Sequence, residues 1–420
     1  MLTRITKLRK PRNLLLLFDI LAIGLLMFYK DEEASKAMGI YASALIALLY
    51  ISNILLEKVT SGDSYIFMIV SMLVSIGAIM NFSIDQSLGI KHLVWALISI
   101  GGFFATYFLI KYVDIWDKLM TPLILLSLGL FLATMVFGKV YNGSKNWIII
   151  GGDGSPGSGF SFQPAEFIKL ALIFIIASFY YNKKYYENVK YSSVIMMGIV
   201  YLFIGFLFLQ KDLGTAVMFL AIFMGIQFIY EDKRGLIFFS IVLTVLAVSL
   251  GYFKFAHVRK RFNIWLDPWS EAGGQILQSL FAISSGGFTG VGLGLGYPKL
   301  IPVVSSDFIF AAICEELGVL TGIGVIMMFL ILVYRAFKVA LVQRHPFYRI
   351  LAIGIAISFG IQTFLAIGGV TKFIPMTGIT TPFISYGGTS MFTSFIALGI
   401  LQVCSEELKH KPIESEPAYE

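Results

Sequence analysis

The chain has 420 residues, of which 57% are hydrophobic and only 14% are charged, and its mean hydropathy is +0.83. Soluble domains carry about 25% charged residues, so this composition excludes a soluble globular protein and indicates a polytopic membrane protein. The net charge of +7 does not indicate nucleic-acid binding, because cationic loops and anionic lipid head groups account for it first. The two cysteines exclude a disulfide framework.

Apolar segments long enough to cross a bilayer recur along the whole chain. A span needs about 20 apolar residues to cross a hydrocarbon core of roughly 30 Å. The first one follows a basic N-terminus and resembles a signal peptide, but it lacks a convincing cleavage site, so we interpret it as an uncleaved helix. We therefore predict an all-α polytopic membrane protein, a bundle of about 12 transmembrane helices with long outer loops. The predicted spans are 13–29, 39–56, 65–82, 92–111, 119–137, 165–181, 192–209, 213–231, 235–253, 307–334, 348–369 and 387–404.

The distribution of lysine and arginine orients these spans. With the N-terminus inside, the cytoplasmic segments hold 19 cations and the outer segments hold 12, which follows the positive-inside trend. We therefore expect both termini in the cytosol and the segments 137–164, 254–306 and 370–386 outside. Elaborate loops usually carry function, so we expect the working site on the outer side.

A charged pair lies near the start of the span 165–181. Glu166 and Lys169 are three residues apart, so they share one face of the predicted helix. A charge pair inside a membrane helix indicates a functional site by default, and the alternative is a mutual salt bridge with a structural role. The sequence leaves both interpretations open.

The outer segment 254–306 gathers cations on the side of the membrane where cations are otherwise depleted. Arg259, Lys260 and Arg261 are consecutive, and these residue types bind phosphate, Arg bidentately. The alternative is adhesion to anionic lipid. Further along, the glycine-rich stretch 286–296 lacks the strand–turn–helix context of a dinucleotide fingerprint, so we reject that interpretation. Its glycines allow a close approach of the backbone to a ligand or to another helix.

Asp307 stands where a proline-containing loop gives way to the span 307–334. A carboxylate partly withdrawn from water is a candidate for a raised pKa and for general-base catalysis. The alternative is an N-cap, for which Asp is well suited. Glu315 and Glu316 follow eight and nine residues later, about 12–13 Å along a helix. We expect these two to pack or pair inside the bundle rather than to share the proton transfer.

Six short motifs, taken together and in order, resemble the SEDS family represented by FtsW, RodA and SpoVE. The resemblance covers roughly residues 64–403. The motifs are Asn146-Trp147; Gln163-Pro164-Ala165-Glu166 with Lys169; Asp212-Leu213-Gly214-Thr215; Gln278-Ser279 with Gly286-Gly287; Asp307-Phe308-Ile309-Phe310-Ala311 with Glu315-Glu316-Leu317-Gly318; and Pro375-Met376-Thr377-Gly378 with Pro382-Phe383-Ile384-Ser385-Tyr386-Gly387-Gly388.

The resemblance implies a peptidoglycan glycosyltransferase that polymerises lipid II at the outer face of a bacterial cytoplasmic membrane, for cell division or elongation. It implies that Asp307 is the catalytic base, which takes the proton from the acceptor's GlcNAc 4-hydroxyl. Cations or a divalent ion, Mg²⁺ or Mn²⁺, would steady the leaving pyrophosphate. Implied partners are a class B penicillin-binding protein (a transpeptidase) and other division or elongation proteins. The candidate substrate-binding residues are Arg259, Lys260, Arg261, Glu166, Lys169, Trp147, Gln278, Ser279, Ser385 and Gly387.

The chain departs from the family pattern in three places. It has two additional N-terminal spans, Ser305-Ser306 where the family commonly has His-Thr, and Gln210-Lys211 where the family commonly has Gln-Pro. We divide the chain into an extension (1–60), a SEDS membrane domain (61–405) and a cytosolic tail (406–420). We expect the extension to be peripheral to catalysis, on the premise that neither of its helices carries a membrane-embedded charge.

Two other functions remain as alternatives. A lipid II flippase would need a polar path through the bundle and working sites on both faces. A non-catalytic scaffold for the division machinery would have no need for Asp307. The sequence does not separate division from elongation or sporulation, and it does not decide whether a metal is used.

Overall fold

The protein is a bundle of long helices. The computed structural model describes residues 11–29, 32–141, 143–151, 160–183, 191–270 and 273–406. Within these ranges, ten helices are long and apolar enough to cross a membrane, and the 17-residue α15 and the 19-residue α2 occupy the two remaining predicted spans. The twelve are α2 (Pro11–Tyr29), α3 (Glu32–Val59), α4 (Ser64–Ile84), α5 (Gln86–Tyr112), α6 (Met120–Phe137), α7 (Pro164–Tyr181), α8 (Ser192–Leu209), α9 (Leu213–Tyr230), α10 (Arg234–Lys254), α13 (Ile309–Val342), α14 (Pro346–Val370) and α15 (Gly388–Cys404).

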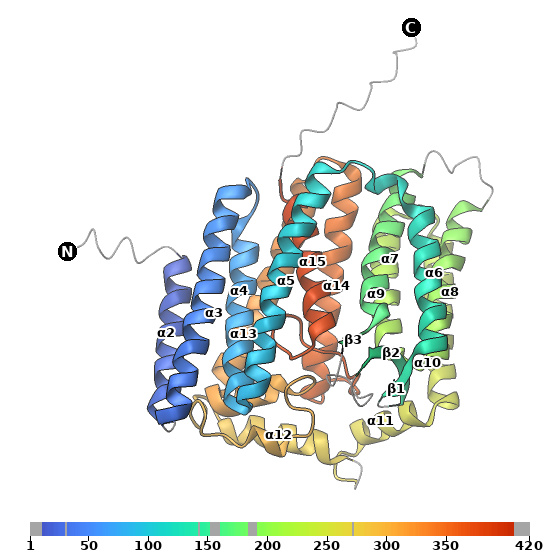
Figure 1. Ribbon diagram of the computed structural model, residues 1–420. Helices are drawn as coiled ribbons and strands as arrows, with labels where there is room; N and C mark the ends of the chain where they lie inside the picture. Colours follow the sequence, from blue (N-terminus) through green and yellow to red (C-terminus); the bar gives the residue numbers. More distant parts are fainter. Residues whose placement is uncertain are drawn as a thin grey trace.

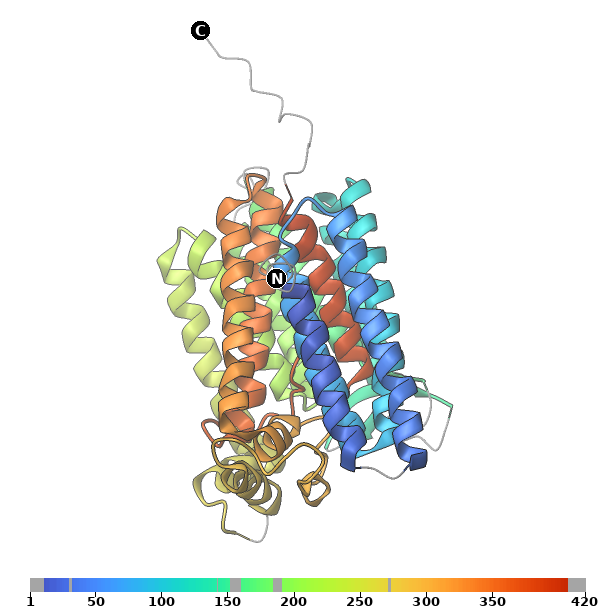
Figure 2. The ribbon, with the colours of Figure 1, turned by 90° about the vertical axis from the view of Figure 1, so that its left-hand side faces the viewer.

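These helices stand roughly side by side, and they differ in how deeply they are buried (Figures 1 and 2). Helices α4, α7, α14 and α15 are the most buried, whereas α6 and α10 leave most of their apolar surface exposed. An apolar helix surface that no protein covers is what a bilayer requires, so α6 and α10 form part of the lipid-facing perimeter. The predicted fold class, an all-helical polytopic membrane protein, is confirmed.

The smaller elements collect at one end of the bundle, at the bottom of Figure 1. Two short helices occupy much of the segment that the sequence suggested was an outer loop, and a small sheet with strand order β1-β2-β3 was not predicted. The exception is η1 (Trp116–Lys118), a three-residue turn of helix that joins α5 to α6 at the other end of the bundle. The other small elements are β1 (Lys139–Tyr141), β2 (Ser144–Ile150), β3 (Phe160–Phe162), α11 (Ala256–Leu266), α12 (Gly274–Gly286) and η3 (Pro298–Leu300).

The glycine-rich stretch packs against α13 and not against a ligand-sized space. A Cβ atom on Gly286 would lie 2.0 Å from the carbonyl oxygen of Cys314, and one on Gly290 would lie 2.2 Å from that of Glu316. Glu316 accepts a hydrogen bond from Gly294 N–H at 2.8 Å, and Glu315 accepts one from Tyr297 N–H at 3.1 Å. The two glutamates therefore join this stretch to α13, as expected of residues that pack inside the bundle.

The N-terminal helices α2 and α3 form a hairpin against α4, and one premise about them was wrong. Asp19 lies within α2, is 1% exposed, and accepts a hydrogen bond from Ser75 Oγ of α4. An acidic side chain buried at membrane depth costs free energy unless it has a hydrogen-bond partner, so the Ser75 hydroxyl offsets part of the cost of burying Asp19. The hairpin thus carries a membrane-embedded acidic group after all.

Candidate active site

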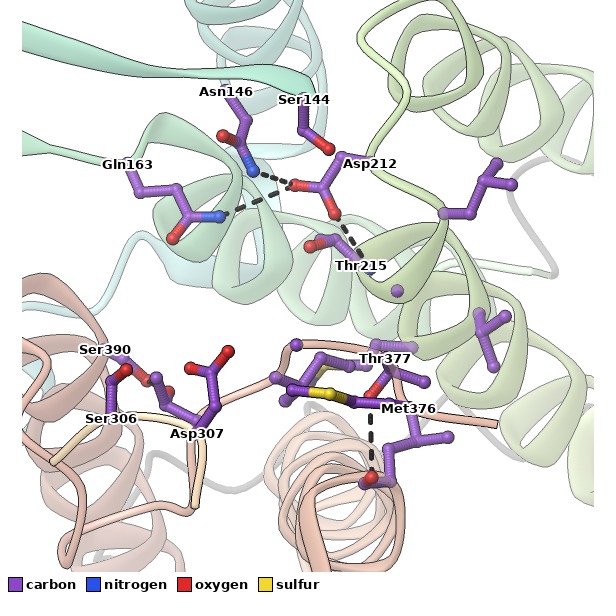
Figure 3. Close-up of a pocket in the computed structure, with 18 of the residues that line it drawn as sticks. Ser144, Asn146, Gln163, Asp212, Thr215, Ser306, Asp307, Met376, Thr377 and Ser390 are labelled. Atoms are coloured by element: carbon purple, nitrogen blue, oxygen red, sulfur yellow. Dashed lines mark hydrogen bonds between the residues drawn. The ribbon is translucent and has the colours of Figure 1, made fainter. Parts of the chain in front are cut away.

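A cavity of about 820 Å³ opens at the end of the bundle that carries the small elements. Its walls come from α5, β2, β3, α7, α8, α9 and the turn between them, α10, α11, the turn 303–307, the end of α14, the segment that joins α14 to α15 and the start of α15. Asp307 and Asp212 point into it from facing walls, as Figure 3 shows. The cavity therefore collects residues from most of the motifs that the sequence singled out.

Asp307 sits in a turn that a neighbouring segment holds in place. The N–H groups of Ser306 and Asp307 both donate to the carbonyl oxygen of Val303, at 3.3 and 3.1 Å. Ser385 Oγ donates to the carbonyl oxygen of Ser306 at 2.5 Å, and Tyr386 N–H donates to that of Ser305 at 2.8 Å. These bonds fix the backbone from which the Asp307 carboxylate projects.

The Asp307 side chain does not cap α13. The cap residue is Phe308, and no side chain bonds to the first turn of this helix. Burial raises the pKa of Asp307 above its usual value, and the Ser306 hydroxyl and the positive charge of Arg261 partly oppose that shift. A carboxylate with a raised pKa, close to a cation and open to a cavity, has the properties of a general base.

Arg261 lies beside Asp307, at the turn around Gly378 in the α14–α15 segment. Its Nη1 donates to the carbonyl oxygen of Thr377 at 2.7 Å. A Cβ atom on Gly378 would lie 3.5 Å from Nη2 of Arg261 and 3.7 Å from Oδ2 of Asp307, so both groups border the same small space. Burial lowers the pKa of Arg261, and attraction to Asp307 and Asp212 opposes that shift. Arg side chains stay charged in proteins, so a partly buried positive charge faces the candidate base.

Asp212 organises the opposite wall and connects the small sheet to α9. Its carboxylate accepts hydrogen bonds from Asn146 Nδ2 at 2.7 Å and from Thr215 N–H at 3.2 Å, and Gln163 Nε2 lies 3.5 Å away (Figure 3). Ser144 Oγ of β2 donates to the carbonyl oxygen of Lys211 at 2.8 Å. The short turn before α9 thus joins this helix to the small sheet, and the Asp212 carboxylate is the acceptor of the hydrogen bonds that hold them together.

Replacing Asp212 by alanine is expected to lower stability by about 2–4 kcal/mol, because α9 loses its cap and the buried Asn146 amide loses its acceptor. Asp212→Asn is the matched control. Asn also caps helices, and Asn146 Oδ1, which has no hydrogen-bond partner now, could accept from the new amide after a flip. Thermal unfolding in detergent measures both variants. Equal melting temperatures for Asp212→Ala and the unsubstituted protein would contradict this role.

The charged pair on α7 lies at the inner border of the cavity. Lys169 Nζ donates to Glu166 at 2.7 Å and to Gln362 Oε1 at 3.1 Å, and Thr393 Oγ1 donates to the same Glu166 oxygen at 3.1 Å. Glu166 lines the cavity, whereas Lys169 is 3% exposed and lies behind it. The contacts match the mutual salt bridge, one of the two interpretations that the sequence left open.

The cationic run on α11 divides between two faces of the helix. Arg261 faces the cavity together with His257, one helical turn before it, and the adjacent Phe262. Arg259 and Lys260 border a separate shallow hollow on the other face, and Arg259 Nη2 donates to the carbonyl oxygen of Phe253 at 2.8 Å. The structure therefore brings one of these three cations to Asp307 and leaves the other two outside the cavity.

The remaining predicted site residues also divide. Trp147 and Gly387 line the cavity. Ser385 lies behind the wall and holds the Asp307 turn. Gln278 and Ser279 lie on α12 and do not line the cavity. Ser279 Oγ donates to the carbonyl oxygen of Val370 at 3.2 Å and so joins α12 to α14.

Several cavity residues escaped the sequence reasoning. Lys91 and Trp95 on α5 line the cavity with Leu88, at spacings of three and four residues that place all three on one helix face. That periodicity was a usable signal, but the predicted span began only at residue 92. Lys211, Asp212, His257 and Tyr386 are the other titratable residues of the lining that were not selected as site residues.

The described residues do not assemble a metal site. In the ranges that the structure covers, no three His, Cys, Asp or Glu side chains group closely enough to hold a metal ion. Asp307 and Asp212 lie on facing walls, as Figure 3 shows. Among these residues the chain alone therefore offers no three-ligand site for the suggested divalent ion.

Comparison with known proteins identifies the family. The profile described as "Cell cycle protein", which covers FtsW, RodA and SpoVE, matches residues 63–410. The chain belongs to this SEDS family. Stage V sporulation protein E of Bacillus subtilis is 34% identical over 366 residues, which are 82% of this chain and 97% of that protein. The "Probable peptidoglycan glycosyltransferase FtsW" of Geobacter sp. strain M18 is 31% identical over 380 residues, 84% of this chain and 99% of its own.

A third SEDS relative matches over a shorter region. The "Peptidoglycan glycosyltransferase RodA" of Mycobacterium leprae is 35% identical over 291 residues, 66% of this chain, and the match spans 61% of the length of that protein. The solved RodA of Thermus thermophilus shares the fold, with a TM-score of 0.61 and 23% identity over 84% of this chain and 100% of the other. A solved peptidoglycan synthase complex that coordinates polymerization and crosslinking contains a chain with a TM-score of 0.66 and 25% identity, covering 82% of this chain and 97% of the other.

Proposed function

We propose that this SEDS protein is a peptidoglycan glycosyltransferase that polymerises lipid II into glycan strands. The observation that carries the proposal is the Asp307 carboxylate beside the partly buried Arg261 guanidinium in a large cavity. Asp307 removes the proton of the acceptor's GlcNAc 4-hydroxyl as its oxygen bonds to the donor's C1. The bond between C1 and the lipid pyrophosphate breaks, and the pyrophosphate leaves with the electron pair.

The cavity supplies complementary groups for the rest of such a substrate. Arg261, Lys211 and Lys91 supply positive charge for pyrophosphate, which Arg binds especially well. Ile204 and Phe208 of α8, together with apolar residues of α10, form an apolar wall that suits a lipid chain. Two relatives named as peptidoglycan glycosyltransferases, one of them probable, support the same activity.

A flippase and a scaffold are less well supported. The cavity lies at one end of the bundle, and the Glu166, Lys169, Gln362 and Thr393 side chains close hydrogen bonds among themselves at its inner border. A scaffold gives no reason to bury Asp307 and Arg261 around one space. Purified protein incubated with labelled lipid II decides the matter: glycan polymer supports the transferase, and its absence with well-folded protein refutes it.

We propose further that the cavity faces outward from the cytoplasmic membrane of a bacterium, with both termini cytosolic. The cation bias that supports this orientation is a sequence property. A class B penicillin-binding protein is the partner that we propose, since a solved complex with a related chain coordinates polymerization and crosslinking. We also propose that the chain consists of an extension (1–60), a SEDS membrane domain (61–405) and a cytosolic tail (406–420). We propose that it acts in either cell division or cell elongation.

The orientation predicts a labelling pattern for two single-cysteine variants. Thr289→Cys, exposed and next to α12 at the cavity end, should react with an impermeant thiol reagent in intact cells. Lys233→Cys, exposed beyond the far end of α9, should react only after permeabilisation. The native Cys314 and Cys404 are buried, so background labelling should be low. The reverse pattern would overturn the orientation and the outward-facing site.

A further inference from the structure

Helix α4 lies between the N-terminal hairpin and the segment that holds the Asp307 turn. One face of α4 carries Ser71, Ser75, Ala78 and Phe82, at the spacing of three and four residues that keeps side chains on one side of a helix. This face meets α2 and α3. Because the family profile begins at residue 63, the hairpin lies outside the region that the chain shares with the family.

Polar contacts join the hairpin to that face of α4. Ser75 Oγ donates to the buried Asp19 carboxylate of α2. Asn53 Nδ2 of α3 donates to Ser71 Oγ at 2.9 Å. Polar groups that bond inside the membrane region have few alternative partners, so such contacts favour one arrangement of the helices.

An aromatic residue reinforces the outer half of the same contact. The hydroxyl of Tyr41 donates to the carbonyl oxygen of Ala78 at 3.0 Å, and its ring lies 4.5 Å from that of Phe82, centroid to centroid. Tyr41 is 4% exposed. The hairpin thus contacts α4 over several turns, up to the end that borders the site.

The other side of α4 touches the segment that supports Asp307. A Cβ atom on Gly77 would lie 2.5 Å from the carbonyl oxygen of Ile384, and Asn81 Nδ2 donates to that oxygen at 3.3 Å. The next residue, Ser385, donates to the carbonyl oxygen of Ser306. A displacement of α4 would therefore reach the backbone beside Asp307 through two contacts.

A second route runs through the glycine-rich stretch. A Cβ atom on Gly294 would lie 3.0 Å from a methyl carbon of Leu26, a buried residue of α2. Gly294 N–H and Ser83 Oγ both donate to the carboxylate of Glu316, which lies on α13 nine residues after Asp307. The hairpin is thus connected to the segment that holds Asp307 through α4, and to α13 through α4 and Gly294.

We propose that the α2–α3 hairpin is an intramembrane brace, meaning that it holds α4, and through α4 the turn that carries Asp307, in one position. Asp19, Tyr41 and Asn53 are then positioning residues for the proposed glycosyl transfer. They act through α4 and do not touch substrate. A misplacement of about 1 Å at reacting atoms can cost on the order of 10²-fold in rate, so a brace of this kind affects turnover without changing the chemistry. The proposal rests on the proposed function only in its assignment of Asp307 as the base.

The test compares three full-length variants in α2. Asp19→Leu removes the acceptor of the Ser75 hydrogen bond, Asp19→Asn keeps an acceptor, and Leu21→Ala alters a side chain that is 59% exposed on the same helix. We expect Asp19→Leu to lower kcat for lipid II polymerisation about tenfold with little change in KM, in the range of couplings carried through packed contacts. Asp19→Asn and Leu21→Ala should stay within about twofold of the unsubstituted protein, by the same reasoning.

Hydrogen–deuterium exchange separates this brace from a general loss of stability. In folded Asp19→Leu protein, amides of residues 303–307 and 381–386 should exchange faster, while those of α9 should not. Unchanged kcat and unchanged exchange at 303–307 would overturn the proposal. If Asp19→Leu does not fold, Tyr41→Phe removes a single hydrogen bond and should shift both readouts in the same direction, and no shift there would also overturn it. If the unsubstituted protein makes no polymer, the proposed function fails, and the exchange result still decides the brace.

Discussion

Replacing Asp307 by asparagine is expected to lower the rate of lipid II polymerisation by about 10²–10⁴-fold, because the amide cannot accept the proton of the acceptor hydroxyl. Folding should be little affected. The side chain does not cap α13, whose cap residue is Phe308, so the substitution removes no helix cap. Polymer formed from labelled lipid II, measured beside a thermal unfolding curve, gives both quantities for each variant.

Asp85 provides the matched control for this substitution. It caps α5 near the cavity residue Leu88 and accepts from the N–H groups of Ser87 and Leu88. Asn caps helices about as well as Asp, so Asp85→Asn should keep both stability and rate. Asp307→Glu should also be slow, because a shift of about 1 Å in the carboxylate is poorly tolerated. A well-folded Asp307→Asn enzyme with a near-normal rate would remove Asp307 from the mechanism.

The long helices and the candidate base could be predicted from the sequence. The helices depend on the local run of apolar residues, and the base on its local position and on the family resemblance. Apolar runs of sufficient length have one stable outcome in a bilayer, so the twelve spans follow from composition and length. Asp307 was found because a charged residue stood at a boundary between loop and span. Its capping role, the alternative interpretation, failed because the helix begins later, at Ile309, and leaves Asp307 in the turn before it.

The cations of the site could not be selected in the same way. Arg259, Lys260 and Arg261 are equivalent in a loop, and only a helix separates them: residues 257, 258, 261 and 262 face the cavity, while 259 and 260 face away. Val258, Phe262 and Trp265 do recur at helical spacing, but the segment was interpreted as a loop and this periodicity was not used. The small sheet was missed for another reason: β1 and β3 have only three residues each, too few to show a strand pattern. Strand β2 pairs with both of them, and Lys145 N–H also donates to the distant carbonyl oxygen of Gln210 at 2.9 Å.

Replacing Arg261 by glutamine is expected to lower polymerisation by about 10²–10³-fold, the usual cost of losing one group that stabilises transition-state charge. The guanidinium borders the same space as the Asp307 carboxylate and faces the region where the leaving pyrophosphate would develop charge. Arg259→Gln and Lys260→Gln are matched controls on the opposite face of α11, and both should retain most activity. Rates in liposomes of neutral lipid keep bulk attraction to anionic lipid out of the comparison.

The pH dependence of the Arg261→Gln variant tests the same contact independently of rate. Burial raises the pKa of Asp307, and the positive charge of Arg261 lowers it in part. The base acts only when deprotonated, so activity falls as the pH drops through that pKa. Without Arg261 the carboxylate holds its proton more tightly, and the acidic limb of the pH–rate profile should move to higher pH. The Lys260→Gln profile should not move, because Lys260 lies on the other face of the helix. An Arg261→Gln enzyme with an unshifted acidic limb and a normal rate would show that the only role of Arg261 is its hydrogen bond to Thr377. The pyrophosphate charge would then have to be neutralised by another cation of the cavity lining, Lys211 or Lys91.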